Sequence, residues 1–399
     1  MNASARRLAP LLAALAMIGP FTIDTFFPAF RVMGEHFKVS PAAMQQTISV
    51  YLLVYAVMAL FHGPLSDAYG RRRVIIFFTL LFAAASLGCA LATSFSALLG
   101  FRMMQGLAAG AGLIIGRAII RDRFGGADAQ RLMAQVTLIF GVAPAIAPVI
   151  GGWLLSATGE WRPLFGALCL FALAVSGWCA WQLPETHAPA LRTPFNARTL
   201  ARTYASMLRD GPFLWLSLAA SFNFAALFMY ISSAPAVVLD VLKLGEQDFA
   251  WLFVPAIGGM MLGAALSGRL AGRRTPNQMM RLVYRLSTIA LAVNLLINLL
   301  LPPSVPWTVL PLALIGVGIA LGFPTLAILI LDRFPLTRGA GSSLQTAISL
   351  FFMALLSGSL SPLVAHQPLL LALTSALLSA LGYACWKRGQ ARLMEPALP

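Results

Sequence analysis

Twelve long apolar runs constrain the fold of this chain more than any other feature of its sequence. A helix of roughly 20 apolar residues crosses the ~30 Å hydrocarbon core of a bilayer. Little sequence remains between the runs, so they predict an all-α membrane protein with twelve transmembrane helices. The runs lie at about residues 8–30, 42–62, 74–93, 96–118, 132–155, 164–183, 213–236, 249–270, 282–301, 307–331, 343–363 and 368–386.

The composition excludes a water-soluble globule. Of the 399 residues, 59% are hydrophobic and only 10% are charged, whereas a soluble domain averages about 25% charged residues. A net charge of +15 would suggest a nucleic-acid partner for a soluble chain. Here the lysines and arginines gather at the ends of the apolar runs, so we expect a lipid bilayer, and no nucleic acid, as the partner of this charge.

The lysines and arginines also predict an orientation. With the N-terminus in the cytoplasm, the cytoplasmic segments hold 21 of them and the outer loops only four, as the positive-inside rule requires. Both termini are therefore expected in the cytoplasm. The first run follows Arg6 and Arg7 as a signal peptide would, but it is too long for one and contains Asp24 and Pro28. We expect a retained first helix.

The longest cytoplasmic connection, residues 184–212, carries Pro184, Pro189, Pro194 and four arginines. It divides the chain into two expected six-helix bundles, residues 1–183 and 213–399. Within the connection, residues 196–209 form either a surface amphipathic helix or a solvated linker. If this segment is a helix, one of its sides carries Leu200, Tyr204 and Leu208.

Residues for enzymatic chemistry are lacking. The four cysteines fall inside apolar runs and the four histidines are scattered, so neither type shows metal-ligand or catalytic spacing. The sequence contains no phosphate-binding G-x-x-x-x-G-K-[ST] loop. We therefore expect no catalytic residue, no metal and no cofactor. These observations disfavour a membrane enzyme, a receptor or an ATP-driven pump.

The connection between the second and third runs carries the most specific motif. Residues 63–73 read GPLSDAYGRRR; the glycines permit a tight turn, and the acid can pair at a helix end. The spacing resembles the G-x-L-x-D-x-x-G-R-R signature of the major facilitator superfamily. That resemblance implies two pseudo-symmetric six-helix bundles and a conformational gating loop built on Gly63, Asp67, Gly70, Arg71 and Arg72.

Three further motifs resemble the same superfamily. Residues 268–274 (GRLAGRR) repeat the loop motif about half a chain later, as two related halves would, with Gly272 standing where the first copy has its acid. Residues 102–106 (RMMQG) resemble the R-x-x-Q-G motif. Residues 141–152 (GVAPAIAPVIGG) resemble the antiporter motif, although Ala147 replaces a glycine; a plain packing seam between helices is the other interpretation. The matching positions are Gly141, Pro144, Pro148, Gly151 and Gly152.

One branch of the superfamily is indicated. Residues 23–30 (IDTFFPAF) resemble the D-x-[YF]-x-P-A segment of the Bcr/CflA drug-resistance branch, and residues 230–235 (YISSAP) and 339–343 (GAGSS) resemble that branch too. The resemblance implies a proton-driven antiporter that exports drug-like small molecules across the bacterial inner membrane, and we expect a monomer. The alternative within the same fold is a proton-coupled exporter or symporter of a metabolite such as an amino acid or a sugar.

Asp24 and Arg102 are the charged residues that lie clearly within apolar runs. Each is about six residues from the outer end of its run, roughly 9 Å deep at 1.5 Å per residue, where an ionised side chain costs at least about 2.5–3.5 kcal/mol. A proton or a cationic substrate can each neutralise Asp24, so we expect these residues to couple proton and substrate. A static Asp24–Arg102 clamp and a simple cap or water contact are the alternatives.

A cavity for varied substrates should be apolar and aromatic, with few polar anchors. The candidates are Tyr51 and Tyr55, one helical turn apart, Asn223 and Tyr230, which share a helix face, and Gln105 of the R-x-x-Q-G motif. Each is equally consistent with packing between helices. Two further polar residues are expected to form hydrogen bonds between helices instead, namely Asn294 and Asn298.

Overall fold

The computed structural model describes residues 3–124 and 126–394, and all regular structure in those ranges is helical. The chain divides into two compact units, Met1–Ala197 (unit 1) and Arg198–Pro399 (unit 2). Within the described ranges, twelve segments are long and apolar enough to cross a membrane. The prediction of twelve membrane helices is therefore confirmed.

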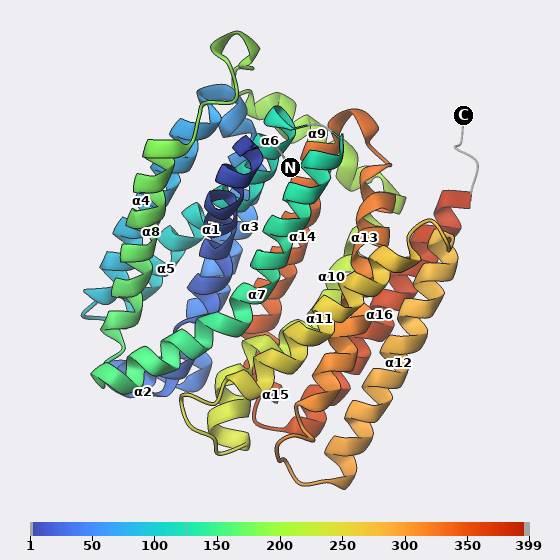
Figure 1. Ribbon diagram of the computed structural model, residues 1–399. Helices are drawn as coiled ribbons and strands as arrows, with labels where there is room; N and C mark the ends of the chain where they lie inside the picture. Colours follow the sequence, from blue (N-terminus) through green and yellow to red (C-terminus); the bar gives the residue numbers. More distant parts are fainter. Residues whose placement is uncertain (1–2, 125, 395–399) are drawn as a thin grey trace. The chain divides into compact units, whose positions relative to one another are not determined.

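Unit 1 contains six of these segments, and two of them are interrupted (Figure 1). The first is shared by α1 and α2, and the fourth by α5 and α6. The elements of unit 1 are α1 (Ala3–Asp24), the 3-10 turn η1 (Phe27–Ala29), α2 (Phe30–Phe37), α3 (Pro41–Tyr69), α4 (Arg71–Ala90), α5 (Phe95–Ala109), α6 (Ala111–Arg123), α7 (Gly126–Thr158), α8 (Arg162–Gln182) and the 3-10 turn η2 (Pro189–Leu191).

Unit 2 contains the other six segments, and π-helical turns follow two of its long helices. Its elements are α9 (Ala197–Arg209), α10 (Gly211–Ser232), the π-turn η3 (Ala236–Val241), α11 (Ala250–Leu270), α12 (Pro276–Leu300), α13 (Leu310–Leu331), the 3-10 turn η4 (Pro335–Thr337), α14 (Arg338–Leu355), the π-turn η5 (Leu356–Leu360), α15 (Ser361–Val364) and α16 (Pro368–Met394).

Polar caps fix where several helices begin. The side chains of Ser40, Ser94 and Asp210 each accept a hydrogen bond from a backbone N–H three residues on, at the starts of α3, α5 and α10. At α12, Thr275 and Gln278 form a reciprocal capping box. These bonds satisfy N–H groups that the first helical turn leaves unpaired.

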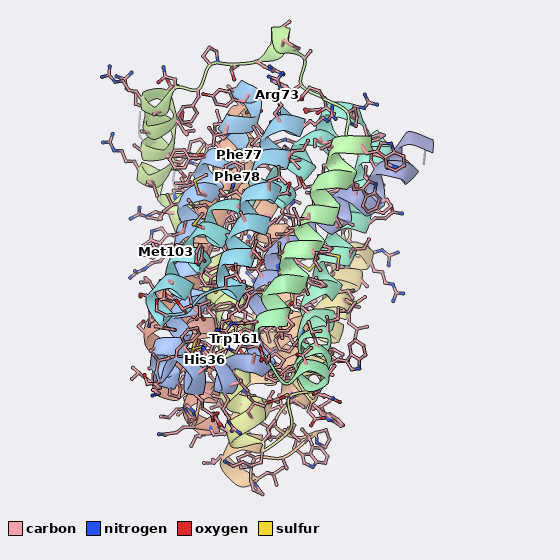
Figure 2. All side chains as sticks on the ribbon, turned by 90° about the vertical axis from the view of Figure 1, so that its left-hand side faces the viewer. His36, Arg73, Phe77, Phe78, Met103 and Trp161 are labelled. Atoms are coloured by element: carbon pink, nitrogen blue, oxygen red, sulfur yellow. The ribbon has the colours of Figure 1, made fainter. Side chains whose placement is uncertain are left out.

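One side of unit 1 carries an apolar band between two polar ends (Figure 2). Arg73 lies toward one end of this side, and His36 and Trp161 lie toward the other. Between them, Phe77 is 61% exposed and Met103 is 44% exposed. Large apolar side chains that face outward in such a band form the surface expected against lipid tails.

The connection between the bundles contains a helix, as one of its two interpretations predicted. This helix, α9, buries Tyr204 and Met207, whereas Leu208 of the predicted apolar side is 46% exposed. Tyr204 is hydrogen-bonded to Ser343 of α14, and burial raises the pKa of Tyr204 to about 12. The apolar face of α9 therefore packs on unit 2.

Asp210 joins the start of α10 to the end of α13. Arg333 donates to this carboxylate twice, from Nε to Oδ1 at 3.2 Å and from Nη2 to Oδ2 at 2.7 Å. The hydrogen bonds to Asp210 raise the pKa of Arg333 further above its ordinary value. This two-pronged ion pair holds two membrane segments of unit 2 together at one end.

Candidate functional site

The first membrane segment is broken beside its buried acidic residue. α1 ends at Asp24, and the chain passes through η1 before α2 starts at Phe30. Pro28 lies in the first turn of η1, where its missing backbone N–H does not interrupt a helical ladder. The single helix predicted over residues 8–30 is therefore wrong in this respect, because a run of apolar residues does not reveal a change of backbone conformation within it.

The carboxyl group of Asp24 is buried at this break and only partly satisfied. Asp24 is 3% exposed. Among the described residues, neither its Oδ1 nor the Oγ1 of neighbouring Thr25 has a hydrogen-bond partner. A buried polar atom without a partner costs about 1–3 kcal/mol, and an unpaired charge costs more. The break thus presents polar atoms that a proton or a ligand group can engage.

The antiporter motif packs directly on the break. Gly151 of α7 lies against the backbone of Thr25, so that a Cβ at Gly151 would lie 2.9 Å from the Thr25 carbonyl carbon and closer still to its oxygen. Only glycine permits so close an approach. Pro144 and Pro148 lie inside α7, which bends along its length in Figure 1. Gly152 is buried next to Gly151. The structure therefore packs Gly151 of the antiporter motif against the residue that follows Asp24.

Arg102 of α5 is fully buried and is held by uncharged groups. Its Nε donates to the Thr47 backbone oxygen at 3.0 Å, and its Nη1 donates to the Thr22 backbone oxygen at 3.0 Å and to Gln105 Oε1 at 2.7 Å. The Nε2 of Gln105 in turn donates to Ser86 Oγ at 2.8 Å. Peptide and amide oxygens thus take the place of water at Nε and Nη1, whereas Nη2 has no hydrogen-bond partner among the described residues.

Two aromatic rings complete the surroundings of Arg102. Its guanidinium carbon lies 4.5 Å from the centre of the Phe26 ring and 4.7 Å from that of Tyr51, which are favourable cation–π distances. In the described part of the chain no ion pair joins Arg102 to Asp24, although both act electrostatically on Tyr51. The static clamp is therefore not formed in this structure.

The cavity candidates of unit 1 lie in its packed interior. The rings of Tyr51 and Tyr55 are 6.1 Å apart and meet edge to face, and the Tyr51 hydroxyl donates to the Gly19 backbone oxygen at 3.3 Å. Tyr51 and Gln105 are fully buried, and Tyr55 is nearly so. Tyr51 and Gln105 contact Arg102, and the place of all three residues in a substrate cavity stays a prediction.

The cavity candidates of unit 2 are buried on α10. Tyr230 accepts a hydrogen bond from Asn294 Nδ2 of α12 at 2.7 Å, so Asn294 forms the expected bond between helices. Asn298 instead donates within α12, to the backbone oxygen of Asn294 at 2.7 Å. Asn223 is also buried. The Tyr230 hydroxyl therefore serves helix packing, and a substrate role for either α10 residue stays a prediction.

Unit 2 contains a junction that corresponds to the break beside Asp24. α10 ends at Ser232, and Pro235 follows just before the π-turn η3. The hydroxyls of Ser233 and Ser361, the first residue of α15, are hydrogen-bonded at 2.8 Å. In unit 1 the first segment contacts the fifth at its interruption, through Gly151, and in unit 2 the residue after the end of α10 contacts the fifth segment through Ser361.

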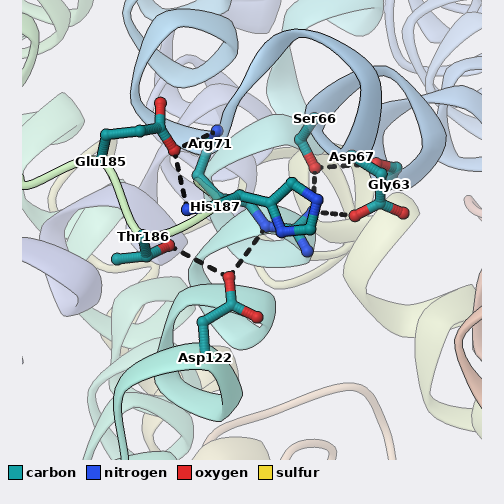
Figure 3. Close-up of polar contacts among 8 residues, drawn as sticks. All are labelled: Gly63, Ser66, Asp67, Arg71, Asp122, Glu185, Thr186 and His187. Atoms are coloured by element: carbon teal, nitrogen blue, oxygen red, sulfur yellow. Dashed lines mark hydrogen bonds and ion pairs between the residues drawn. The ribbon is translucent and has the colours of Figure 1, made fainter. Parts of the chain in front are cut away.

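Arg71 is the centre of a polar cluster where α3 meets α4 (Figure 3). Its guanidinium is ion-paired with Asp67 and, at 3.1 Å, with Asp122 of α6. Its Nη1 also donates to Ser66 Oγ at 2.5 Å, and its backbone N–H donates to Glu185 Oε1 at 3.0 Å. Arg71 is only 7% exposed, so water screens these contacts weakly. The cluster joins α3, α4, α6 and the segment after α8.

The segment after α8 is held to this cluster by its own contacts. Thr186 Oγ1 donates to Asp122 Oδ2 at 3.0 Å, and the His187 backbone N–H donates to Glu185 Oε1 at 3.1 Å. Arg72 donates to a backbone oxygen of α8. The end of unit 1 at which α3 meets α4 is thus one connected hydrogen-bond network.

Glycines set the geometry of the loop motif. Gly70 has φ 98° and ψ 143°, a conformation open essentially to glycine alone. Gly63 lies inside α3, and its carbonyl accepts a hydrogen bond from Ser66 Oγ at 2.7 Å. In the second copy, Gly272 has φ 73° and directly precedes an arginine, as Gly70 does. Gly272 therefore shares a positive φ with Gly70, although its spacing from Gly268 matches that of Asp67 from Gly63.

Sequence reasoning missed three residues of these sites. Asp122 and Glu185 lie four and two residues beyond the predicted runs that end at 118 and 183, where the sequence indicates no partner for them. His62 was grouped with the scattered histidines. It is fully buried, and its Nε2 lies 3.0 Å from the Leu107 backbone oxygen, just before Gly110 separates α5 from α6. His62 therefore caps a carbonyl beside the break in the fourth segment.

Metal-ligating residue types are dispersed. Within residues 3–124 and 126–394, no group of three His, Cys, Asp or Glu side chains is placed to hold a metal ion. The four cysteines are buried thiols.

Comparison with known proteins gives concordant matches. The profile of the Major Facilitator Superfamily matches residues 12–362. The chain is 31% identical over 363 residues to an uncharacterized MFS-type transporter, YdgK, of Bacillus subtilis (90% of this chain, 88% of the relative). It is 29% identical over 333 residues to the multidrug resistance protein MdtM of Salmonella typhimurium (84% and 80%). Its fold is similar to that of a bacterial homolog of the human lysosomal transporter Spinster, solved in an inward-facing and unoccupied conformation, with a TM-score of 0.73, 15% identity and 100% coverage of both chains.

Proposed function

This chain belongs to the major facilitator superfamily, and we propose that it exports drug-like small molecules from the bacterial cytoplasm in exchange for protons. It is a transporter rather than an enzyme, as its family and relatives are. The proposal includes a multi-pass location in the inner membrane with both termini in the cytoplasm. It also includes action as a monomer, driven by the proton gradient without a cofactor. The multidrug resistance relative supports the substrate class.

The buried carboxyl group of Asp24 carries this proposal. An ionised carboxylate at this position needs a counter-charge, because an unpaired buried charge is strongly destabilising. Arg102 does not pair with it in this structure: its Nε and Nη1 bond Thr22, Thr47 and Gln105, and its Nη2 has no partner among the described residues. A proton or a cationic group of a substrate can neutralise Asp24, and each excludes the other. Mutually exclusive binding at one carboxylate is the linkage that an exchanger requires.

The contact between Thr25 and Gly151 supports a route from Asp24 to α7. The two backbones touch without an intervening side chain. Close-packed backbones transmit displacement because no flexible group absorbs it. A rearrangement of the break on loss of the proton therefore has to shift α7 as well. We expect the Ser233–Ser361 junction to play the matching part in unit 2.

The Arg71 cluster supports a gating role for the loop motif. Alternating access is largely a rigid-body motion of one bundle against the other, and rigid bodies need firmly joined helix ends. Arg71 supplies such a joint through Asp67, Asp122 and the backbone contact to Glu185. We expect its loss to slow the transport cycle more than it weakens substrate binding.

Asp24→Asn tests the coupling role, because the amide keeps the size and polarity of the side chain but cannot carry the proton. The protein is reconstituted into vesicles that contain a pH dye, and ethidium-dependent proton movement is recorded. We expect exchange to fall by at least about tenfold, with the melting temperature in detergent unchanged or raised. The matched control is Glu160→Gln on an exposed loop of the same unit, which should exchange normally. Full proton-dependent exchange by Asp24→Asn would remove the coupling role.

The choice between drugs and metabolites needs a separate experiment. An efflux-deficient bacterium that expresses the chain is challenged with cationic, neutral and zwitterionic compounds. Protection that disappears with Asp24→Asn supports drug export. If no compound is resisted, while vesicles preloaded with an amino acid or a sugar release it in an Asp24-dependent manner, the metabolite alternative is correct.

A further inference from the structure

A second arginine, beyond Arg102, lies inside the fourth membrane segment of unit 1. Arg117 is next to the end of the apolar run predicted at 96–118, but α6 continues to Arg123. Arg117 therefore lies about six residues, or roughly 9 Å, inside this end of the segment, and its side chain is only partly exposed. A guanidinium at this depth is costly unless it meets a partner or lines a water-filled space, so it is a functional candidate.

Arg117 differs from Arg102 in its surroundings. Arg102 is fully buried and donates three hydrogen bonds to oxygens of the protein. Arg117 forms no hydrogen bond or ion pair with the residues that the structure describes. The carboxylate that its own helix carries, Asp122, is paired with Arg71. The five N–H donors of the Arg117 guanidinium are therefore not used by the described part of the protein.

The face of the fourth segment that carries Arg117 lies along α3. Gly110 belongs to this face, because it precedes Arg117 by seven residues and keeps helical backbone angles (φ −78°, ψ −18°). A Cβ at Gly110 would lie 3.1 Å from Cδ2 of the Tyr55 ring on α3. Arg117 and Tyr55 also act on each other electrostatically. Arg117 is therefore on the side of α6 that faces Tyr55, inside unit 1, rather than on a side turned to lipid.

The hydroxyl of Tyr55 is unused as well. It forms no hydrogen bond with the described part of the chain. It is also not one of the enclosed atoms that lack a partner, and the side chain keeps 7% of its surface exposed, so the hydroxyl remains accessible to a ligand. A guanidinium beside a phenolic O–H offers a positive charge and several donors. A carboxylate or similar oxyanion accepts such bonds, two of them from the arginine fork, whereas a cation is repelled.

We propose that Arg117 and Tyr55 form a subsite for the carboxylate of a transported compound, so that the substrates include anionic and zwitterionic molecules. This inference rests on the proposed function, which supplies the transport and the orientation. In that orientation the subsite lies on the cytoplasmic side of Arg102, because the fifteen residues from 102 to 117 span about 22 Å of helix. A compound that enters from the cytoplasm meets Arg117 first, and the ammonium group of a zwitterion remains free for Asp24.

The test measures binding to the purified protein in a neutral detergent, without a proton gradient. The probes are rhodamine 110 and rhodamine 123, which share one xanthene body; the first carries a free carboxylate and the second carries its methyl ester. The fluorescence anisotropy of each dye is titrated with the wild type, Arg117→Gln, Arg117→Lys and Tyr55→Phe. The matched control is Arg123→Gln, which removes the same charge from an exposed arginine at the end of the same helix.

We expect the wild type and the control to bind rhodamine 110 more tightly than rhodamine 123. Arg117→Gln should weaken the binding of rhodamine 110 by about tenfold, since it removes a charge-assisted contact. Rhodamine 123 should bind this variant as well as before or more tightly, because a repelling cation is gone. Arg117→Lys keeps the charge without the fork and should keep part of the preference. Tyr55→Phe should weaken rhodamine 110 by less than Arg117→Gln does, and it should not affect rhodamine 123.

Three results would overturn the subsite. The first is a wild type that does not bind rhodamine 110, or binds the two dyes equally. The second is an equal change for both dyes in Arg117→Gln, which would show a structural role; if that variant does not fold, loss of the preference in a folded Arg117→Lys decides the same question. The third is equal weakening of rhodamine 110 by Arg123→Gln, which would show general attraction to a basic surface.

The test separates this inference from the function on which it rests. Binding of rhodamine 110 through Arg117, in a protein that shows no Asp24-dependent exchange in vesicles, would remove the proposed function and leave an oxyanion site. Normal Asp24-dependent exchange, in a protein that binds the two dyes equally, would remove the subsite and leave the proposed function.

Discussion

Replacing Gly151 by alanine adds one methyl group where α7 meets the break in the first membrane segment. The new Cβ would lie 2.9 Å from the carbonyl carbon of Thr25 and 3.4 Å from its Cα. Because these are backbone atoms, no change of rotamer relieves the contact, and either α7 or the break has to move. Gly141 belongs to the same motif, and nothing lies within 4 Å of an ideal Cβ there. Gly141→Ala is therefore the matched control.

The size of the effect follows from the packing. Overpacking by one carbon costs about 1–3 kcal/mol. For a unit of this length, each kcal/mol lowers the melting temperature by about 2–4 °C, so Gly151→Ala should melt roughly 2–12 °C lower. Exchange should fall by about tenfold or more, because a displacement of about 1 Å at a functional group is sufficient for such a loss. Gly141→Ala meets no atom and gains helix propensity, so it should melt at the same temperature or slightly higher.

Both quantities are measured on purified protein, by scanning fluorimetry in detergent and by ethidium–proton exchange in vesicles. If Gly151→Ala melts and exchanges like Gly141→Ala, the contact does not constrain the break and the reasoning is wrong. Thr25→Ala removes the side chain but leaves the carbonyl in place, so it should not rescue Gly151→Ala. A rescue would show that the contact involves the Thr25 side chain instead.

Two further substitutions test the polar joints of unit 1. Arg71→Lys keeps the charge but cannot bond both carboxylates of its cluster, so we expect a loss of about 1–3 kcal/mol in stability and slower exchange; equal effects from Arg73→Lys, at the exposed end of α4, would contradict the network. His62→Phe keeps a ring but leaves the Leu107 carbonyl without a donor, which should lower the melting temperature, whereas His62→Gln retains a donor and should recover part of the loss. Identical melting of the three proteins would exclude the cap.

The membrane segments could be predicted from sequence because the thickness of the bilayer requires about 20 apolar residues per helix. The mean hydropathy of a run detects such a stretch. The eighth run, predicted at 249–270, is observed as α11, Ala250–Leu270. The ninth was predicted to begin at 282, yet α12 begins at Pro276 behind the Thr275 capping box. Polar residues continue that helix beyond the apolar run, and the cap rather than hydropathy determines its start.

The helix breaks could not be predicted in the same way, because they depend on partners distant in sequence. At the break after Asp24, Arg102 donates to the Thr22 carbonyl two residues earlier, and Gly151 packs on the Thr25 carbonyl. Hydropathy describes side chains and carries no information about the contacts of backbone carbonyls. Pro28 was visible in the sequence, but a proline inside an apolar run signals a bent helix as readily as a broken one.

The sequence indicated candidate residues for the site, but it did not predict the contacts that these residues make. The loop motif indicated Asp67 and Arg71, but Asp122 and Glu185 come from other helix ends, and only the fold brings them to Arg71. Equal depth in the membrane placed Arg102 near the level of Asp24. Depth does not specify the direction in which a side chain points around its helix, so the absence of an ion pair between them was not foreseeable.

The separation of Asp24 from Arg102 suits a carboxyl group that changes its charge repeatedly. If Arg102 depended on Asp24 for its counter-charge, each protonation would leave a buried guanidinium unpaired, a state that costs about 3–5 kcal/mol. Arg102 instead donates from Nε and Nη1 to Thr22, Thr47 and Gln105, bonds that do not involve Asp24, while its Nη2 has no partner among the described residues. Asp24 is also the last residue of α1, where the negative end of the helix dipole disfavours an anion. The permanent charge joins α1, α3 and α5 in this structure, and in the proposed exchange the carboxyl group at the break is the one that a proton or a cationic substrate neutralises.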